Sequence, residues 1–199
     1  ELDAYLRAYQ AKGYPPVSHS EEYHSAYAPA YRVIRAEFQP YFALLCQIDR
    51  LRAEGEAVNV AIDGNSGSGK TYLACLLEQV YDCNIIHMDH FFLPVVLRTE
   101  GRLSEAGGNI DYDRFSREVL EGLASGGDFS YGIYDCAQGE IVNQVQVPRK
   151  QLNIIEGVYS MHPKFIGHYT FKVLLQTDAK TQSKRILERS GAALHQRFI

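Results

Sequence analysis

Apolar and polar positions follow two different periods along the chain after residue 57. Four short, nearly continuous apolar runs, at 58–63, 84–88, 152–156 and 171–176, are typical of buried parallel strands. Segments between and after them carry apolar residues at helical spacing. Because strands alternate with helices, we expect an α/β fold with a mostly parallel sheet covered on both faces.

The expected helices are amphipathic. Those over 70–81 and 112–124 should bury Leu73, Leu76, Leu77, Val80, Phe115, Val119 and Leu123. The last helix should begin after Thr177 and Asp178, a good capping pair, and run toward Gly191.

Residues 99–147 interrupt the alternation. A polar, glycine-containing stretch at 99–109 is expected to be a loop. The segments 129–134 and 140–147 flank Gln138 and Gly139, a pattern that predicts a β-hairpin.

The residues before 57 lack strand-like alternation. A helix over 41–52 would place Tyr41, Leu44, Leu45, Ile48 and Leu51 on one face, and Gly55 would end it. Pro29 and Pro40 should divide the preceding residues into shorter helical pieces. We therefore expect an N-terminal helical extension (1–56) and a second domain (57–199). The chain starts at Glu1 rather than Met and stops at Ile199, so truncation, at the C-terminus above all, is left open.

Composition narrows the classes of protein. The 199 residues carry a net charge of −4 and no basic stripe, which argues against a nucleic-acid binder. No run of 18 apolar residues or signal-peptide core is present, so no membrane partner is expected. The four cysteines form no CxxC pair, which favours free thiols in a cytoplasmic protein. A homo-oligomer remains possible.

One motif carries specific chemistry. Residues 64–71 match G-x-x-x-x-G-K-[ST] in full, and they lie between a predicted strand and a predicted helix. The backbone N–H groups of such a loop surround phosphate oxygens, and the helix adds its dipole. Lys70 would reach the β and γ phosphates, and Thr71 would offer its hydroxyl to Mg²⁺. The expected ATP-binding residues of the loop are Gly64, Asn65, Ser66, Gly67, Ser68, Gly69, Lys70 and Thr71.

Two carboxylates follow predicted strands, Asp89 after 84–88 and Glu156 at the end of 152–156. At the edge of a parallel sheet where ligands bind, one could organise Mg²⁺ while the other accepts a proton from an attacking hydroxyl. Asp63 also ends a strand, but a structural or Lys70-pairing role suits it better. Asp111 and Asp113 precede a helix, where capping is the default role and contact with substrate hydroxyls the alternative.

These segments resemble the uridine kinase and phosphoribulokinase-like branch of the P-loop kinases. I-D-G-N-S-G-S-G-K-T, starting at Ile62, looks like the family's first strand and phosphate loop, and H-M-D-H-F-F, from His87 to Phe92, is similar to its M-D-S-F-Y. The resemblance implies a P-loop NTPase fold, a three-layer α/β/α sandwich. It also implies that Asp89 is the catalytic base and that Glu156, in I-I-E-G, lies near Mg²⁺ with Thr71.

Weaker segments of the resemblance concern the acceptor and the lid. N-I-D-Y-D-R-F resembles a segment that contacts ribose hydroxyls, which implies substrate binding by Asp111, with Asp113 in reserve. Tyr134 belongs to a Y-D pair like that of the family's hairpin near the base, and Phe92 could line the acceptor pocket. Arg185 and Arg189 resemble the arginines of a lid helix over the ATP phosphates. The hairpin continues as C-A-Q-G-E, without the histidine and arginine that recognise a pyrimidine base.

Other side chains have ordinary explanations. His87 and His90 form an H-x-x-H pair, but strand geometry should send them to different sides. Phe91, like Phe92, could line an acceptor pocket, but aromatic residues beside a sheet edge are more often part of the core. Arg98, Arg102 and Arg114 could contact phosphate or substrate, although for each a solvated surface position is the simpler reading.

The resulting hypothesis is a Mg²⁺- and ATP-dependent kinase that phosphorylates a hydroxyl of a small, ribose-like metabolite, with Asp89 and Lys70 as catalytic residues. The alternative from another class is a nucleotide-dependent regulatory ATPase without a small-molecule acceptor. A third possibility is a nucleotide or coenzyme-precursor kinase on the same fold.

Overall fold

The computed structural model describes residues 2–13, 19–28 and 34–196. The chain divides into two compact units, residues 1–49 and residues 50–199. Within the described ranges, no helix has both the length and the apolar character needed to cross a bilayer.

The first unit is built from short helices, as the sequence predicts for this region. They are α1 (Leu2–Ala11), α2 (Glu21–Tyr27), the 3₁₀ helix η1 (Ala36–Tyr41) and most of α3 (Phe42–Ala53). Pro40 lies inside η1, and Pro29 lies outside the described residues. Ile48 of α3 is fully buried, whereas α1 and α2 bury no residue. The domain boundary at residues 56 and 57 remains a prediction.

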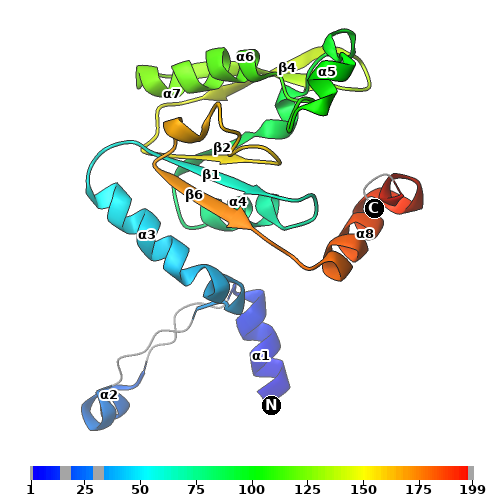
Figure 1. Ribbon diagram of the computed structural model, residues 1–199. Helices are drawn as coiled ribbons and strands as arrows, with labels where there is room; N and C mark the ends of the chain where they lie inside the picture. Colours follow the sequence, from blue (N-terminus) through cyan, green and yellow to red (C-terminus); the bar gives the residue numbers. More distant parts are fainter. Residues whose placement is uncertain (1, 14–18, 29–33, 197–199) are drawn as a thin grey trace. The chain divides into compact units, whose positions relative to one another are not determined.

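The second unit contains a four-stranded parallel sheet, which confirms the predicted fold class (Figure 1). Its strands are β1 (Val58–Gly64), β2 (Cys83–His87), β5 (Leu152–Glu156) and β6 (Phe171–Leu175). They lie in the order β2-β5-β1-β6, and each neighbouring pair is parallel. In this register Glu156 is the partner of both Ile62 and His87. The last residues of β2 and β5 therefore lie side by side at one edge of the sheet, next to the carboxyl-terminal part of β1.

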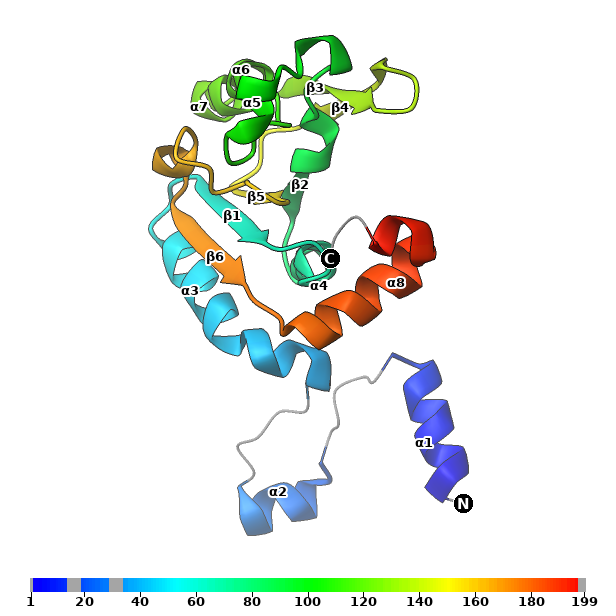
Figure 2. The same cartoon turned by 45° about the vertical axis from the view of Figure 1, so that its right-hand side comes forward.

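Helices cover both faces of this sheet. Helix α4 (Lys70–Glu78) packs on β1, β2 and β5. A continuous helical run lies on the other face beside the antiparallel hairpin of β3 (Phe129–Asp135) and β4 (Glu140–Val147) (Figure 2). The run comprises α6 (Tyr112–Phe115), the short π-helix η4 (Ser116–Leu120) and α7 (Glu121–Ser125). The layers form the expected α/β/α sandwich, and the four cysteines are free, as predicted.

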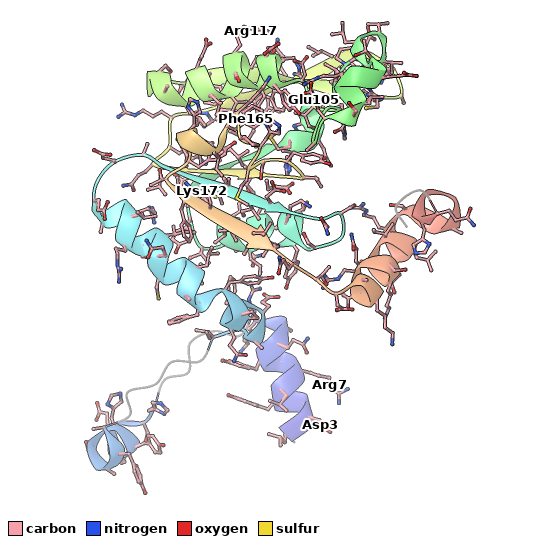
Figure 3. The ribbon with its side chains drawn as sticks, viewed as in Figure 1. Asp3, Arg7, Glu105, Arg117, Phe165 and Lys172 are labelled. Atoms are coloured by element: carbon pink, nitrogen blue, oxygen red, sulfur yellow. The ribbon has the colours of Figure 1, made fainter. Side chains whose placement is uncertain are left out.

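The core on the hairpin face is aromatic. Phe165 is fully buried, and its ring lies 4.6 Å from that of Phe115. Figure 3 shows Phe165 between the central sheet and the helical run, while Arg117 points away from the sheet. The predicted apolar face of 112–124 is therefore confirmed, with Val119 buried and Leu123 packed against the cluster.

Two predictions about the helices and loops of this unit are wrong. The stretch 99–109 contains a short helix, α5 (Glu100–Ser104), because the Thr99 side chain accepts a hydrogen bond from the Arg102 N–H and caps it. Helix α4 ends at Glu78, and Val80 lies in the following turn with 49% of its surface exposed. The turn buries Tyr81 in its place.

The remaining elements are short except for the last helix. They are η2 (Met88–Phe91), η3 (Val95–Leu97) and η5 (Ile166–His168). Helix α8 (Ala179–His195) begins after Asp178, whose side chain accepts from the Thr181 N–H at 2.9 Å. It kinks at Gly191, which has a non-helical φ of 73°. The predicted cap is confirmed. The sequence predicts a helix that runs toward Gly191, and the observed backbone kinks there before it continues to His195.

Candidate active site

The phosphate loop joins β1 to α4, at the carboxyl edge of the sheet. Gly64 has a φ of +148°, and a Cβ there would lie 2.3 Å from the carbonyl oxygen of Leu175. Gly67 and Gly69 also have positive φ, at +78° and +100°. Glycine is therefore required for both the curvature of the loop and its close approach to β6.

Lys70 lies inside this loop. Its ammonium group donates to the carbonyl oxygens of Gly64 and Asn65, at 2.8 Å and 3.0 Å. Burial lowers the pKa of Lys70, and the negative charges of Glu156, Asp63 and Asp89 act in the opposite direction. A buried cation thus stands at the centre of a loop whose geometry suits phosphate.

The Glu156 carboxylate accepts hydrogen bonds from two side chains. The Thr71 hydroxyl donates to its Oε1 at 3.1 Å, and Nδ1 of His87 contacts the same oxygen at 2.6 Å. Glu156 is 5% exposed. The hydrogen bond from His87 to Glu156 is the main reason that the pKa of His87 is raised.

The oxygens of Thr71 and Glu156 fit a magnesium ion. Mg²⁺ takes oxygen ligands at 2.0–2.1 Å in octahedral geometry, so two neighbouring ligands lie about 3 Å apart. The Thr71 Oγ1 to Glu156 Oε1 distance of 3.1 Å agrees with that spacing. Magnesium usually takes only one or two protein ligands beside phosphates and water, so this pair would be sufficient.

Asp89 stands at the same edge in a different state. It is the second residue of η2, just after the end of β2. It is exposed, and its side chain forms no hydrogen bond with any residue that the structure describes. Although the residue as a whole is exposed, protein atoms around the carboxyl group limit its solvation, and this raises its pKa above the ordinary 3.8. The charge of Glu156 adds to the increase, while Lys70, His87 and Arg189 oppose it.

Asp63 has a structural role. Its carboxylate accepts from the N–H groups of Gly64 (2.6 Å), Tyr159 (3.1 Å) and Met161 (2.9 Å). It therefore ties the loop after β5 to the start of the phosphate loop. Of the two predicted roles, the hydrogen bonds favour the structural one.

Helix α8 contacts the phosphate loop through three side chains on one face. Arg185 donates to the Gly67 carbonyl at 3.0 Å, and Arg189 donates to the Ser66 hydroxyl at 3.1 Å. Gln182, which was not predicted from the sequence to contact the loop, donates to the Ser66 carbonyl at 3.0 Å. The spacing of residues 182, 185 and 189, three and then four apart, places them on the same helical face and could have identified Gln182.

Each of the expected acceptor-binding residues has a contact or a buried position within the protein. Asp111 is the N-cap of α6, and its side chain accepts from the Arg114 N–H at 3.0 Å. Phe92 is half-buried and forms an isolated bridge with Ile110. Tyr134 is 6% exposed within β3.

The reading of Arg114 as a solvated surface arginine is wrong. It is 7% exposed and donates to the carbonyl oxygens of Gly132, at 2.8 Å, and His90. Its guanidinium also lies 4.3 Å from the centroid of the Phe91 ring. Buried between η2 and β3, it fixes the segment that carries Asp89 onto the hairpin.

The side chains of Arg98 and Arg102 also form hydrogen bonds within the protein. Arg98 donates to the Leu93 carbonyl at 2.7 Å. Arg102 pairs with Glu105 at 2.8 Å and donates to the Ile110 carbonyl, also at 2.8 Å.

The expectation that His87 and His90 point to different sides is also wrong. Their rings meet edge to face at 5.1 Å. The strand ends at His87 and η2 begins at Met88, so residues three apart fall on the same side. His90 in turn contacts the Tyr131 hydroxyl through Nδ1 at 3.2 Å, and burial lowers its pKa to about 4.

No protein-family model matches the chain. Among solved structures, a possible uridine kinase from Bacillus stearothermophilus is similar, with a TM-score of 0.58 and 19% identity. The alignment covers 81% of this chain and 92% of that one. A putative fructose transport system kinase from Silicibacter sp. TM1040 is similar at a TM-score of 0.57 and 24% identity, over 74% and 80% of the two chains. The chain therefore shares the α/β fold of these two structures, and the resemblance of its motifs to the uridine kinase-like branch is matched at the level of the fold.

Proposed function

We propose that the chain is an ATP-dependent kinase that transfers the γ-phosphate to a hydroxyl of a small, uncharged, ribose-like metabolite, with Mg²⁺ bound by Thr71 and Glu156. One observation carries the proposal. Two carboxylates flank the phosphate loop in different states, Glu156 buried and hydrogen-bonded, Asp89 exposed and unbonded. Phosphoryl transfer needs both a metal-organising group and a base that is free to accept a proton.

In this mechanism Asp89 accepts the proton of the substrate hydroxyl as the hydroxyl oxygen bonds to the γ-phosphorus, and the bond from that phosphorus to the β–γ bridging oxygen breaks, so that ADP leaves. A raised pKa brings a carboxylate closer to the operating pH and makes it a better base. Lys70 turns from its carbonyl partners to the phosphate oxygens, and Arg185 and Arg189 lie beside the loop to offset the charge of the transferred group. Bound Mg²⁺ would neutralise charge between the β and γ phosphates.

The residues between η2 and the hairpin favour an uncharged acceptor over a phosphorylated one. A phosphate group would call for an uncommitted arginine or lysine. Arg98, Arg102 and Arg114 are the arginines between η2 and the hairpin that the sequence singles out. All three donate to backbone carbonyls, and two of them, Arg102 and Arg114, also pair with the carboxylates of Glu105 and Glu118. This favours an alcohol over a nucleoside monophosphate.

The test is the Asp89→Asn variant. Removal of a general base should lower turnover by roughly 10²- to 10⁴-fold, while ATP still binds. Glu121→Gln, at an exposed carboxylate in the first turn of α7, is the control and should keep its turnover. Near-normal turnover of Asp89→Asn on the true substrate would refute the base assignment.

The acceptor itself requires a screen of ATP consumption with nucleosides, sugars, pantothenate-like alcohols and nucleoside monophosphates. Activity with one class of alcohols supports the proposal. A flat result would favour the regulatory ATPase, for which the exposed apolar side chains Leu2, Tyr5 and Leu6 of α1 offer a place for a protein partner. We propose a cytoplasmic location, because exposed free thiols suit a reducing compartment.

A further inference from the structure

Glu156 is a buried carboxylate whose position depends on its neighbours. It ends β5, a strand buried along its whole length. Both of its described hydrogen bonds use Oε1, and among the residues that the structure describes none bonds to Oε2. A glutamate side chain has three rotatable bonds, so two donors on one oxygen determine where the other oxygen lies.

His87 is placed to provide the stronger of these contacts. It is the register partner of Glu156 on the neighbouring strand, so their side chains leave the sheet side by side. The contact from Nδ1 is 2.6 Å, against 3.1 Å for the Thr71 hydroxyl. Because a carboxylate can only accept, Nδ1 carries the hydrogen.

His87 is itself supported. The His90 ring packs edge to face against it, and His90 contacts the Tyr131 hydroxyl of β3. The imidazole therefore lies between a rigid hairpin and the carboxylate. Side chains that orient ligands from outside a metal site change metal affinity without touching the ion.

We propose that His87 is a positioning residue of the Mg²⁺-ATP site. By donating from Nδ1 to Oε1, it holds the Glu156 carboxylate at the place where it orients the Thr71 hydroxyl. This inference rests on the proposed function, because it assigns Thr71 and Glu156 to the metal.

Two substitutions separate this role from a general need for a polar residue. In His87→Asn the amide nitrogen is as many bonds from Cα as Nδ1, so the donor to Glu156 is kept. In His87→Gln the amide lies one bond further out, at the level of Nε2, and the donor is misplaced. The readout is the Kd of ATP by titration calorimetry, in EDTA and over a series of Mg²⁺ concentrations, with thermal unfolding of each variant measured beforehand.

The expected result is a roughly 10- to 100-fold loss of Mg²⁺-dependent ATP affinity in His87→Gln. Its affinity in EDTA should be unchanged, because Lys70 and the loop are intact, and His87→Asn should recover most of the loss. A glutamine variant that binds Mg²⁺-ATP like the wild type, or an asparagine variant as weak as the glutamine one, would overturn the inference. If His87→Gln fails to fold, His87→Ala gives the same comparison. A wild-type chain that binds ATP equally with and without Mg²⁺ would instead refute the metal site of the proposed function.

Discussion

Arg189 and Ser66 lie 123 positions apart in the chain, yet Nη2 of the arginine is 3.1 Å from the serine hydroxyl. Arg185, one turn earlier on α8, reaches the carbonyl of the next loop residue, Gly67. Two cationic side chains of the last described helix thus lie against the phosphate loop. Their charges add to that of Lys70 at the point where a triphosphate would place its own.

Arg189→Ala should reduce turnover on the order of 10²- to 10³-fold, because a fixed donor to the developing charge is lost. Steady-state kinetics and ATP titration would measure the effect. Lys184→Ala is the matched control, since Lys184 lies on the same helix but is exposed and faces Glu188 at 3.9 Å. Equal losses in both variants would show that the helix, rather than the arginine, is responsible.

The pH profile should report Asp89. A base must be ionised to act, so kcat/KM should fall as pH falls through the pKa of Asp89. Because burial and Glu156 raise that pKa, the acid limb should lie above the ordinary carboxyl value of 3.8. Whatever activity remains in Asp89→Asn should lack this limb. An identical acid limb in the variant would assign the titration to another group.

The proposed metal site can be tested by removing the hydroxyl group of Thr71 alone. Thr71→Ser keeps the oxygen that bonds Glu156, and Thr71→Val replaces it with a methyl group of similar shape. The valine variant should lose roughly tenfold or more in Mg²⁺-dependent ATP affinity, whereas the serine variant should stay close to the wild type. Calorimetry with and without Mg²⁺ would distinguish them, and equal behaviour of the two variants would exclude the hydroxyl as a ligand.

Arg114 should matter for stability rather than for chemistry. Arg114→Met would remove the donor to two carbonyl groups and the positive charge paired with the partly buried Glu118, which would keep its hydrogen bond from the Gly132 N–H. Loss of one partner of a buried pair costs about 3–5 kcal/mol in the free energy of unfolding, which urea denaturation would measure. Arg117→Met, at a side chain that is 65% exposed, should change stability by about 0.5 kcal/mol or less. A similar small change in Arg114→Met would contradict the assigned role.

Much of this arrangement is predictable from sequence because it depends on local pattern. The four apolar runs became the four strands of the sheet, with bounds shifted by a residue or so, and β5 occupies the predicted 152–156. Such runs are predictable because a strand buried on both faces must be apolar along its length.

The wrong predictions concern side chains whose positions are determined by tertiary contacts. Arg114 has the composition of a surface residue, and only the approach of Gly132 and His90 explains its burial. His87 and His90 meet because the strand stops at residue 87, a boundary that no local pattern determines. The hydrogen bond from His87 to Glu156 joins residues 69 positions apart, so it too required the register of the sheet.

The strand order also determines when the protein can fold during synthesis. Every pairing in the central sheet includes β5 or β6, the two strands made last. The β3–β4 hairpin can close from local contacts, but β1 and β2 have no partner strand until the ribosome has passed residue 152. Two apolar segments therefore remain unpaired through most of translation, the state in which chains rich in non-local contacts are most exposed to aggregation and to chaperones.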